Sequence, residues 1–268
     1  MNQPLQHYGA HLRVNGIRLH YLRRGRDGLP PLVIIPGISS PAATWAFVAD
    51  RFADAFDTYV IDLRGRGLSS NEPDLDYGTA ACVADIAGLC AALGLARVNR
   101  LGHSLCARIA TAVAFAHPEC AERLVLVDPP VSGPGRRRFG MTLEALLDAI
   151  ARASAGSYDL APLLRDHPQW PEAVVRTRVE WQHTCSVAAT TASYHAFHDE
   201  DWHALVAQLT MPTLLIVAGH DDVIRPSDAD EIRALLPGIE ITTMPDVGHM
   251  IPLDDLEGFH AITTRFLA

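Results

Sequence analysis

Short apolar runs rich in β-branched residues alternate with helical patterns along most of this 268-residue chain. The runs cover residues 32–35, 58–61, 98–102, 124–127, 213–217 and 240–243. Strands that are apolar along their whole length are typical of a parallel sheet buried on both faces. The helical patterns between them provide the crossover connections that parallel strands need. The alternation therefore predicts an α/β fold with a mostly parallel, doubly wound sheet.

Two segments depart from this rhythm. Near the N-terminus, Asn15-Gly16 joins two strand patterns at residues 11–14 and 18–22, which predicts an antiparallel hairpin. Residues 133–208 contain helical patterns and no clear strand, so we expect an all-helical cap or lid over the site. The predicted core domain then consists of residues 1–132 and 209–268.

Composition narrows the possible partners and the compartment. The formal net charge of −9 argues against nucleic acid, which requires a basic surface. No apolar stretch reaches the roughly 18 residues that a membrane span needs, and residues 1–4 show no signal-peptide pattern. The cysteines are odd in number and lack paired spacing, which suits a reducing cytoplasm. They are Cys82, Cys90, Cys106, Cys120 and Cys185.

A serine lies at the junction between the strand pattern at residues 98–102 and the helical pattern at residues 105–116. The motif is Gly102-His103-Ser104, and a sharp strand-to-helix turn of this kind lifts a serine hydroxyl above the strand ends. The usual signature has a second glycine two residues after the serine, where this chain has Cys106. Cysteine is small enough to take that place, so we expect Ser104 to be a nucleophile.

A serine hydroxyl needs a base to take its proton, and that base must come from a segment far along the chain. His249 lies in the loop between the last strand pattern and the closing helical pattern at residues 253–267. A histidine in this loop can reach the end of the strand that carries Ser104. We therefore expect His249 to be the base.

Two aspartates compete for the carboxylate that orients the histidine. Asp222 follows the strand pattern at residues 213–217, which is the commoner place for the acid in such a sheet. Asp128 ends the preceding strand pattern at residues 124–127. The residues alone favour Asp222 slightly and leave Asp128 open.

Backbone N–H groups are needed to stabilise the negative oxygen that forms during attack on a carbonyl. Ile38 follows the first parallel strand pattern and Leu105 follows the nucleophile, so their N–H groups are the expected oxyanion hole. The Gly-x-Gly within residues 62–69 lacks the third glycine of a dinucleotide loop and is interpreted as a structural turn. The histidines and carboxylates within residues 195–203 lack the spacing of metal ligands, so neither a metal nor a cofactor is expected.

With these residues placed, the chain resembles the α/β hydrolases nearly end to end. Within them it is similar to the N-formylmaleamate deformylases of bacterial nicotinate degradation. The resemblance is carried by residues 36–38, 56–60, 64–70, 73–79, 123–137, 180–181, 183–185 and 248–252. It implies a triad of Ser104, Asp128 and His249. Two departures stand out, since the family has glycine at the position of Cys106 and lacks a carboxylate at that of Asp222.

The resemblance implies a hydrolase that cleaves the formyl C–N bond of N-formylmaleamate through an acyl-enzyme on the serine. The substrate is a small anionic amide, and Arg178, His183 and Arg225 are candidate ligands for its carboxylate. Three alternatives stay open: an enol-lactone or ester hydrolase, a cofactor-free dioxygenase of N-heteroaromatic compounds, and a non-catalytic receptor. The oligomeric state is left open.

Overall fold

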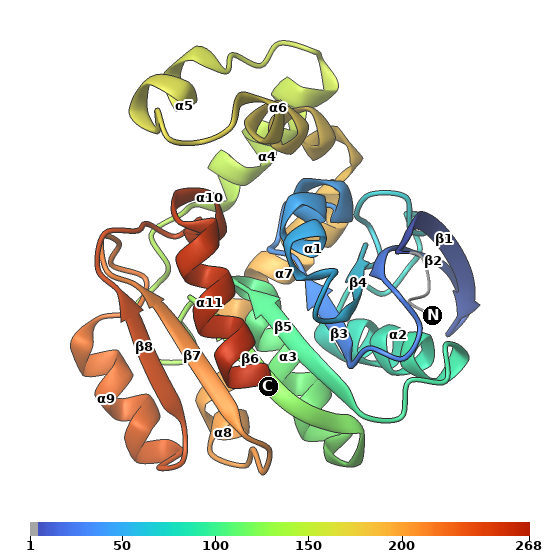
Figure 1. The fold of residues 1–268 in the computed structure, drawn as a ribbon. Coiled ribbons are helices and arrows are strands. Elements are labelled where there is room, and N and C mark those ends of the chain that lie inside the picture. The colour runs from blue at the N-terminus through green and yellow to red at the C-terminus, as the bar shows by residue number, and fades with distance from the viewer. Residues whose placement is uncertain (1–4) are drawn as a thin grey trace.

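A computed structural model describes residues 5–268, and its centre is a single eight-stranded sheet (Figure 1). The strand order is β1-β2-β4-β3-β5-β6-β7-β8. The strands are β1 (Gln6–Val14), β2 (Ile17–Gly25), β3 (Pro31–Ile35), β4 (Asp57–Ile61), β5 (Val98–His103), β6 (Ala121–Val127), β7 (Thr213–Ala218) and β8 (Glu240–Met244). Strands β1, β2 and β4 pair antiparallel, and all later pairs are parallel. The predicted fold class is therefore confirmed. The residues on which the lack of a signal peptide was argued, 1–4, lie outside the described residues.

The antiparallel start turns at the predicted dipeptide. Asn15 has φ 47° and Gly16 has φ 79°, the pair of positive values that a tight hairpin turn requires. The two strands are longer than predicted, because Gln6 pairs with Gly25 at the open end of the hairpin. This end of β1 is mostly exposed and polar, so its pairing depends on backbone hydrogen bonds that leave no apolar pattern.

Helices cover both faces of the sheet, among them α2 (Thr79–Ala92), α3 (Leu105–Ala116) and α9 (Pro226–Leu235), and α3 spans the range predicted for it. The closing segment forms a short α10 (Ile251–Asp254) and the longer α11 (Leu256–Leu267). The short α1 (Ala46–Phe52) was not predicted, because it follows a 3-10 turn and its seven residues are too few to show a helical period. Within residues 5–268, no helix is both long enough and apolar enough to cross a bilayer.

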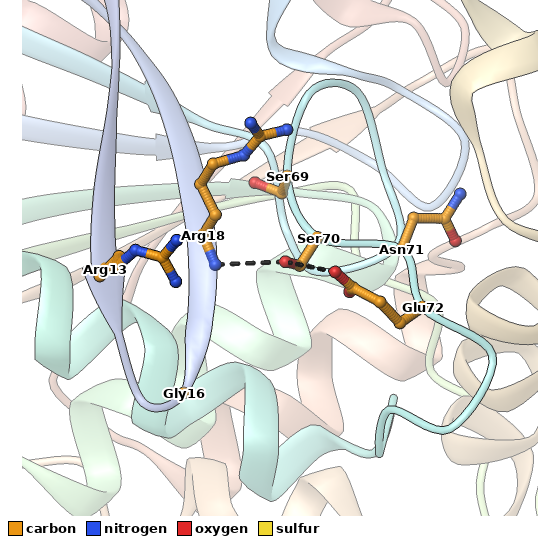
Figure 2. A pocket seen from close by; sticks show the side chains of 7 residues that line it. All are labelled: Arg13, Gly16, Arg18, Ser69, Ser70, Asn71 and Glu72. Atoms are coloured by element: carbon orange, nitrogen blue, oxygen red, sulfur yellow. Dashed lines mark hydrogen bonds between the residues drawn. The ribbon is translucent and has the colours of Figure 1, made fainter.

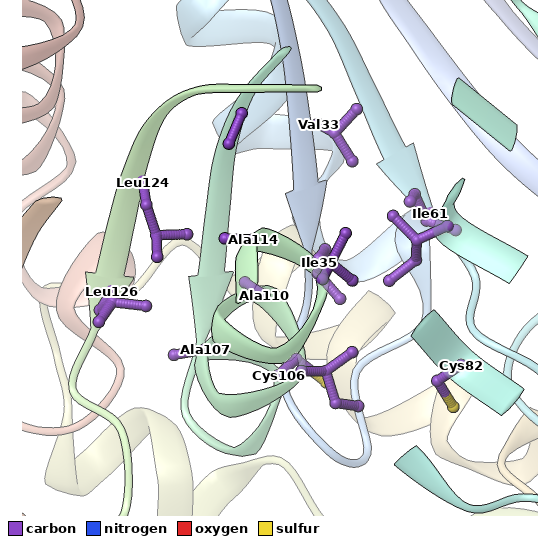
Figure 3. Packing of buried hydrophobic residues seen from close by; sticks show 14 of the residues in the cluster. Val33, Ile35, Ile61, Cys82, Cys106, Ala107, Ala110, Ala114, Leu124 and Leu126 are labelled. Atoms are coloured by element: carbon purple, nitrogen blue, oxygen red, sulfur yellow. The ribbon is translucent and has the colours of Figure 1, made fainter. Parts of the chain in front are cut away.

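Helix α3 packs closely on the sheet, against β5 and β6. Figure 3 shows Ala107, Ala110 and Ala114 of this helix facing the strands, among Ile35 and Leu124. Small side chains on this face allow a close approach of helix and sheet. The opposite face of the sheet packs against α1 and α11 in a second core cluster.

The chain between β6 and β7 forms the helices α4 (Leu143–Ser154), α5 (Ala161–Asp166), α6 (Glu172–Glu180), α7 (Val187–Asp199) and α8 (Trp202–Val206), with no strand among the residues described there. Helices α4, α5 and α6 stand apart from the sheet layers (Figure 1). Helix α8 differs, because Trp202 is buried in the main core and donates to Thr111 Oγ1 at 2.9 Å. The predicted cap, which ends at residue 208, thus includes one helix that packs with the core layer.

Candidate active site

Ser104 occupies a strained turn between β5 and α3. Its backbone has φ 56° and ψ −131°, a region that non-glycine residues rarely adopt. The Ser104 N–H donates to the Val127 carbonyl at 2.8 Å, which ties the turn to the neighbouring strand β6. The side chain stands at the carboxyl ends of the parallel strands. The residue itself is the N-cap of α3. This is the strand-to-helix elbow that the sequence predicts.

Gly102 and Cys106 make this turn possible in different ways. A Cβ at Gly102 would lie 2.4 Å from the Cys106 carbonyl oxygen and 2.6 Å from Ala107 Cα, so only glycine fits there. Cys106 lies fully buried on α3 within the main core. Burial raises the pKa of its thiol to about 12, so the thiol stays protonated and acts as a small apolar group.

His249 lies between Ser104 and Asp128. Its Nε2 is 2.9 Å from Ser104 Oγ, and its Nδ1 is 2.6 Å from Asp128 Oδ2. A carboxylate can only accept, so Nδ1 carries the proton and Nε2 is free to accept from the serine hydroxyl. Asp128 is 0% exposed, and its second oxygen accepts from the Ala218 N–H at 3.2 Å. The arrangement is that of a nucleophile, a base and an orienting acid.

The sequence-based preference for Asp222 is wrong, because Asp128 is the carboxylate that reaches the histidine. The Asp222 side chain is 68% exposed and accepts from Arg225 Nε at 2.8 Å. This hydrogen bond to the guanidinium lowers the pKa of Asp222. The physical reason for the correction is local: an arginine three residues later binds the Asp222 carboxylate at the surface.

The loop after β3 lies against the elbow, as expected for an oxyanion hole. A Cβ at Gly37 would be 3.6 Å from Ser104 Cβ. Ile38 follows this glycine, and Leu105 is the first residue of α3, where the N–H groups of the first turn have no partner within the helix. Both side chains belong to one apolar cluster with Leu146 and Phe197. The two expected donor residues thus flank Ser104 beneath α4 and α7.

His103 supports the histidine loop from below. Its Nε2–H donates to the His249 carbonyl at 2.9 Å, and its ring lies between Trp45 and His249 with centroids 5.1 and 4.9 Å away. Burial lowers the pKa of His103 well below its usual range, and the neighbouring His249 and the Arg178 cation act in the same direction. His103 is therefore neutral and serves as a hydrogen-bond donor.

The three residues expected to bind the substrate carboxylate lie in different surroundings. Arg178, on α6, donates to Ser40 Oγ at 3.2 Å, and burial lowers the pKa of its guanidinium. Within residues 5–268 it forms no salt bridge. His183 is exposed and its ring bonds the Glu180 carbonyl within its own turn, whereas Arg225 is bound by Asp222. Of the three, Arg178 alone is a partly buried cation without an acidic partner.

A cavity of about 510 Å³ opens at the exposed edge of His249. It is lined by Arg137, Arg138, Phe139, Gly140, Met141, Asp221, Asp222, Val223 and Arg225 besides the histidine. Figure 2 shows another hollow, of about 560 Å³, between the β1–β2 hairpin and residues 69–72. Its lining contains none of the residues of the triad. Across residues 5–268, no group of three or more histidine, cysteine or acidic side chains is arranged to hold a metal ion.

Sequence reasoning missed two aspartates that hold the histidine loop. Asp221 Oδ2 accepts from the His249 N–H. Asp254 accepts from the Gly248 N–H at 2.8 Å and from Trp170 Nε1 at 2.7 Å, which joins this loop to the helical segment. Asp221 stands beside Asp222 in the sequence, and Arg225, which binds Asp222, is the one local sign of which aspartate faces the histidine.

Comparison with known proteins agrees with this geometry. The profile of the family described as alpha/beta hydrolase fold matches residues 30–256. N-formylmaleamate deformylase from Pseudomonas putida is 47% identical over 97% of this chain and 96% of its own length. The crystal structure of a serine-to-alanine variant of N-formylmaleamic acid deformylase from Pseudomonas putida S16 superposes with a TM-score of 0.88. The two sequences are 41% identical, and the superposition covers 96% of this chain and 100% of the variant.

An enol-lactonase from Burkholderia xenovorans LB400 has the same fold, with a TM-score of 0.76 at 22% identity over 96% of this chain and 99% of the other. The likeness at this level of identity concerns the fold alone. The family profile, the 47% identical relative and the serine at the elbow agree with one another. The chain is an enzyme of the α/β-hydrolase family.

Proposed function

We propose that this enzyme hydrolyses N-formylmaleamate to maleamate and formate, with Ser104 as nucleophile, His249 as base and Asp128 as the orienting acid. The observation that carries the reaction class is the 2.9 Å contact between Ser104 Oγ and His249 Nε2. The substrate is proposed from the 47% identity with the Pseudomonas putida deformylase over nearly the whole chain.

The first half of the reaction forms a formyl-enzyme. Ser104 Oγ attacks the formyl carbon while His249 Nε2 takes the hydroxyl proton. The N–H groups of Ile38 and Leu105 donate to the oxygen that becomes negative. When the C–N bond breaks, His249 gives its proton to the departing maleamate nitrogen. The adjacent carbonyl stabilises this nitrogen, so it leaves more easily than the nitrogen of a plain amide.

The second half releases formate. A water molecule gives a proton to His249 and attacks the formyl ester of Ser104, and the proton then returns to the serine oxygen. Asp128 accepts from His249 Nδ1 throughout and stabilises the imidazolium that forms in each half. Because Asp128 is fully buried, its charge acts through a region of low dielectric.

Arg178 is the proposed ligand of the substrate carboxylate. Its guanidinium is desolvated, has only a neutral serine as partner at 3.2 Å, and influences the ionisation of His103 next to Ser104. A partly buried cation without an anion is costly, and a bound carboxylate would remove that cost. His183 and Arg225 do not fit this role, because His183 is exposed and bonds within its own turn and Arg225 is bound by Asp222.

The decisive experiment measures formate release from N-formylmaleamate. Wild type should release one formate per substrate, and Ser104→Ala should be slower by about 10⁴-fold or more. Ser157→Ala is the matched control, because this serine is exposed in the loop after α4. If an enol-lactone is turned over faster than N-formylmaleamate, or if oxygen is consumed, the proposed substrate is wrong.

Arg178 is tested by separating substrate charge from reactivity. Arg178→Met should raise KM about 10- to 100-fold for N-formylmaleamate, the loss expected for one charged hydrogen bond. It should change little for the Z isomer of N-formylcrotonamide, which keeps the double-bond geometry and has a methyl group in place of the carboxylate. Arg176→Met is the control, because Arg176 lies on the same helix and binds exposed Glu172. Equal losses on both substrates would argue against the assignment.

We also propose that the enzyme works in the reducing cytoplasm. All five cysteines are free thiols, and Cys82, Cys90, Cys106 and Cys185 are buried. Free buried thiols are typical of proteins that fold where disulfides do not form.

A further inference from the structure

Arg66 is a buried arginine whose acceptors are all neutral. It belongs to the glycine-containing segment after β4 that the sequence suggested was only a structural turn, and it is 2% exposed. Its Nε donates to the Ile38 carbonyl at 3.1 Å, and its Nη1 donates to the Arg64 carbonyl at 3.1 Å. Its Nη2 donates to Ser193 Oγ at 2.6 Å and to the Ala189 carbonyl at 3.3 Å.

The neighbouring Arg64 shows how different this environment is. Arg64 places Nε and Nη2 on the two oxygens of Asp85, at 2.6 and 2.7 Å, as a buried ion pair. Within the described residues Arg66 has no salt bridge of this kind. Its hydrogen bonds are satisfied, but its charge is uncompensated because every acceptor is neutral. A buried charge kept without a counter-ion requires an explanation beyond stability.

The bonds of Arg66 join two parts of the site. Ile38 is a proposed oxyanion-hole donor in the loop after β3, and Ser193 and Ala189 lie on α7, which packs over that loop. The segment itself is tightly docked, since the Ser186 N–H donates to the Gly65 carbonyl at 2.7 Å. A Cβ at Gly65 would be 2.3 Å from Ala189 Cβ.

We propose that Arg66 is a positioning residue, which fixes the oxyanion loop against α7 and holds the Ile38 N–H in place for the transition state. This inference rests on the proposed serine mechanism. Holding the Ile38 carbonyl restricts rotation of the peptide units on both sides of its α-carbon. An oxyanion-hole donor is effective only when its direction is set before the reaction.

The positive charge of Arg66 also supports the oxyanion hole, in addition to its hydrogen bonds. Burial raises the pKa of Cys106 at the start of α3, and the Arg66 cation opposes that rise. The field of the guanidinium therefore reaches the first turn of α3, where the Leu105 N–H is the second proposed donor. A fixed positive charge near both donors favours the negative oxygen in the transition state over the neutral carbonyl of the substrate.

The test separates transition-state positioning from general support of the fold. Arg66→Met should lower kcat about 100-fold, comparable to the loss of one oxyanion donor, and leave the inhibition constant of the product maleamate within about threefold. Arg66→Lys keeps the charge and should recover part of the rate. Ser193→Ala removes one contact from the α7 side and should lower kcat about threefold.

Arg23→Met is the matched control. Arg23 is also largely buried, but it binds Asp57 at the amino end of β4, the opposite end of the sheet from Ser104. This variant should lose stability and keep the kcat of its folded fraction. If Arg66→Met behaves in the same way, or if kcat and maleamate affinity fall together, Arg66 is only structural and the proposal is overturned.

Phosphonylation of Ser104 by a fluorophosphonate makes the test independent of the natural substrate. The phosphoryl oxygen enters the oxyanion hole, so Arg66→Met should react about 100-fold more slowly than wild type, and Arg23→Met at the wild-type rate. If wild type fails to hydrolyse N-formylmaleamate but this difference holds, the proposed substrate fails and the role of Arg66 stands. Should Arg66→Met not fold, Arg66→Lys and Ser193→Ala give the same comparison.

Discussion

The loops after β6 and β7 begin side by side at the same edge of the sheet, yet they present their aspartates differently. Asp128 begins the first loop with φ 46°, is fully buried, and accepts from His249 Nδ1. Asp222 lies in the second loop, exposed and paired with Arg225. The β7 loop still contributes, because Asp221 accepts from the His249 backbone N–H. One loop thus orients the imidazole ring, and the other holds the main chain that carries it.

The difference shows what an aspartate needs to act as the acid of a triad. A carboxylate can order a histidine when it is buried, held by a backbone donor and left without a competing cation. Asp128 meets these conditions through the Ala218 N–H and its strained backbone. Asp222 meets none of them, although its place in the chain is the commoner one for this role.

The largest effect should come from Asp128→Asn. An amide in place of the carboxylate can stabilise the wrong imidazole tautomer and cannot balance the imidazolium charge, so kcat should fall about 10³- to 10⁴-fold. Formate release under saturating substrate measures it. Adding Asp222→Asn to this variant should lower the residual rate no further. A further loss would mean that the β7 loop supplies an alternative acid.

An intermediate effect is expected at Asp221. Asp221→Ala removes the acceptor for the His249 N–H and should lower kcat about 3- to 10-fold, the value of one hydrogen bond. Asp221→Asn keeps an acceptor oxygen and should stay within about twofold of wild type. If the asparagine variant loses as much as the alanine variant, the negative charge, and not the hydrogen bond, is what the β7 loop contributes.

A small effect is expected at Asp222. Asp222→Asn should leave kcat and KM within about twofold of wild type, because the side chain binds only a surface arginine. The same formate assay gives the answer under identical conditions. A loss comparable to that of Asp128→Asn would reverse the comparison of the two loops.

The smallest effect concerns stability. Arg225 lowers the folded-state pKa of Asp222, so any stabilisation from the pair is present at neutral pH and is lost as the pH falls below the usual aspartate range. Because the group is exposed, Asp222→Asn should not measurably shift the urea midpoint at pH 7. A clear shift at pH 7 that disappears at pH 3 would show that the β7 loop is held more tightly than its exposure suggests.

Much of this protein follows from local patterns in its sequence. The apolar runs identified the strands because a strand buried on both faces has no polar side to interrupt it. Gly102 and Ser104 identified the elbow, and the range of α3 was predicted correctly because its pattern runs from the elbow to His117-Pro118. His249 was found because a histidine in the loop before the closing helix can reach the strand ends.

The choice between the two aspartates was decided only by the tertiary structure. Both follow parallel strands that end at one edge, and the direction of each side chain depends on backbone angles that side-chain patterns do not reveal. One signal was present in the sequence: Arg225 lies three residues after Asp222, close enough to bind it. An arginine at that spacing holds the carboxylate of Asp222 at the surface.

The role of the segment with Arg66 also required the folded chain. Its partners Ile38 and Ser193 come from segments far away on either side in the sequence, so no spacing could indicate them. The same holds for Arg178, whose helix brings it to Ser40, and for α8, whose Trp202 packs in the core although it lies within the predicted cap. Patterns along the chain determined the strands and the nucleophile, because those depend on neighbouring residues. Contacts between distant segments determined which charged groups surround the nucleophile.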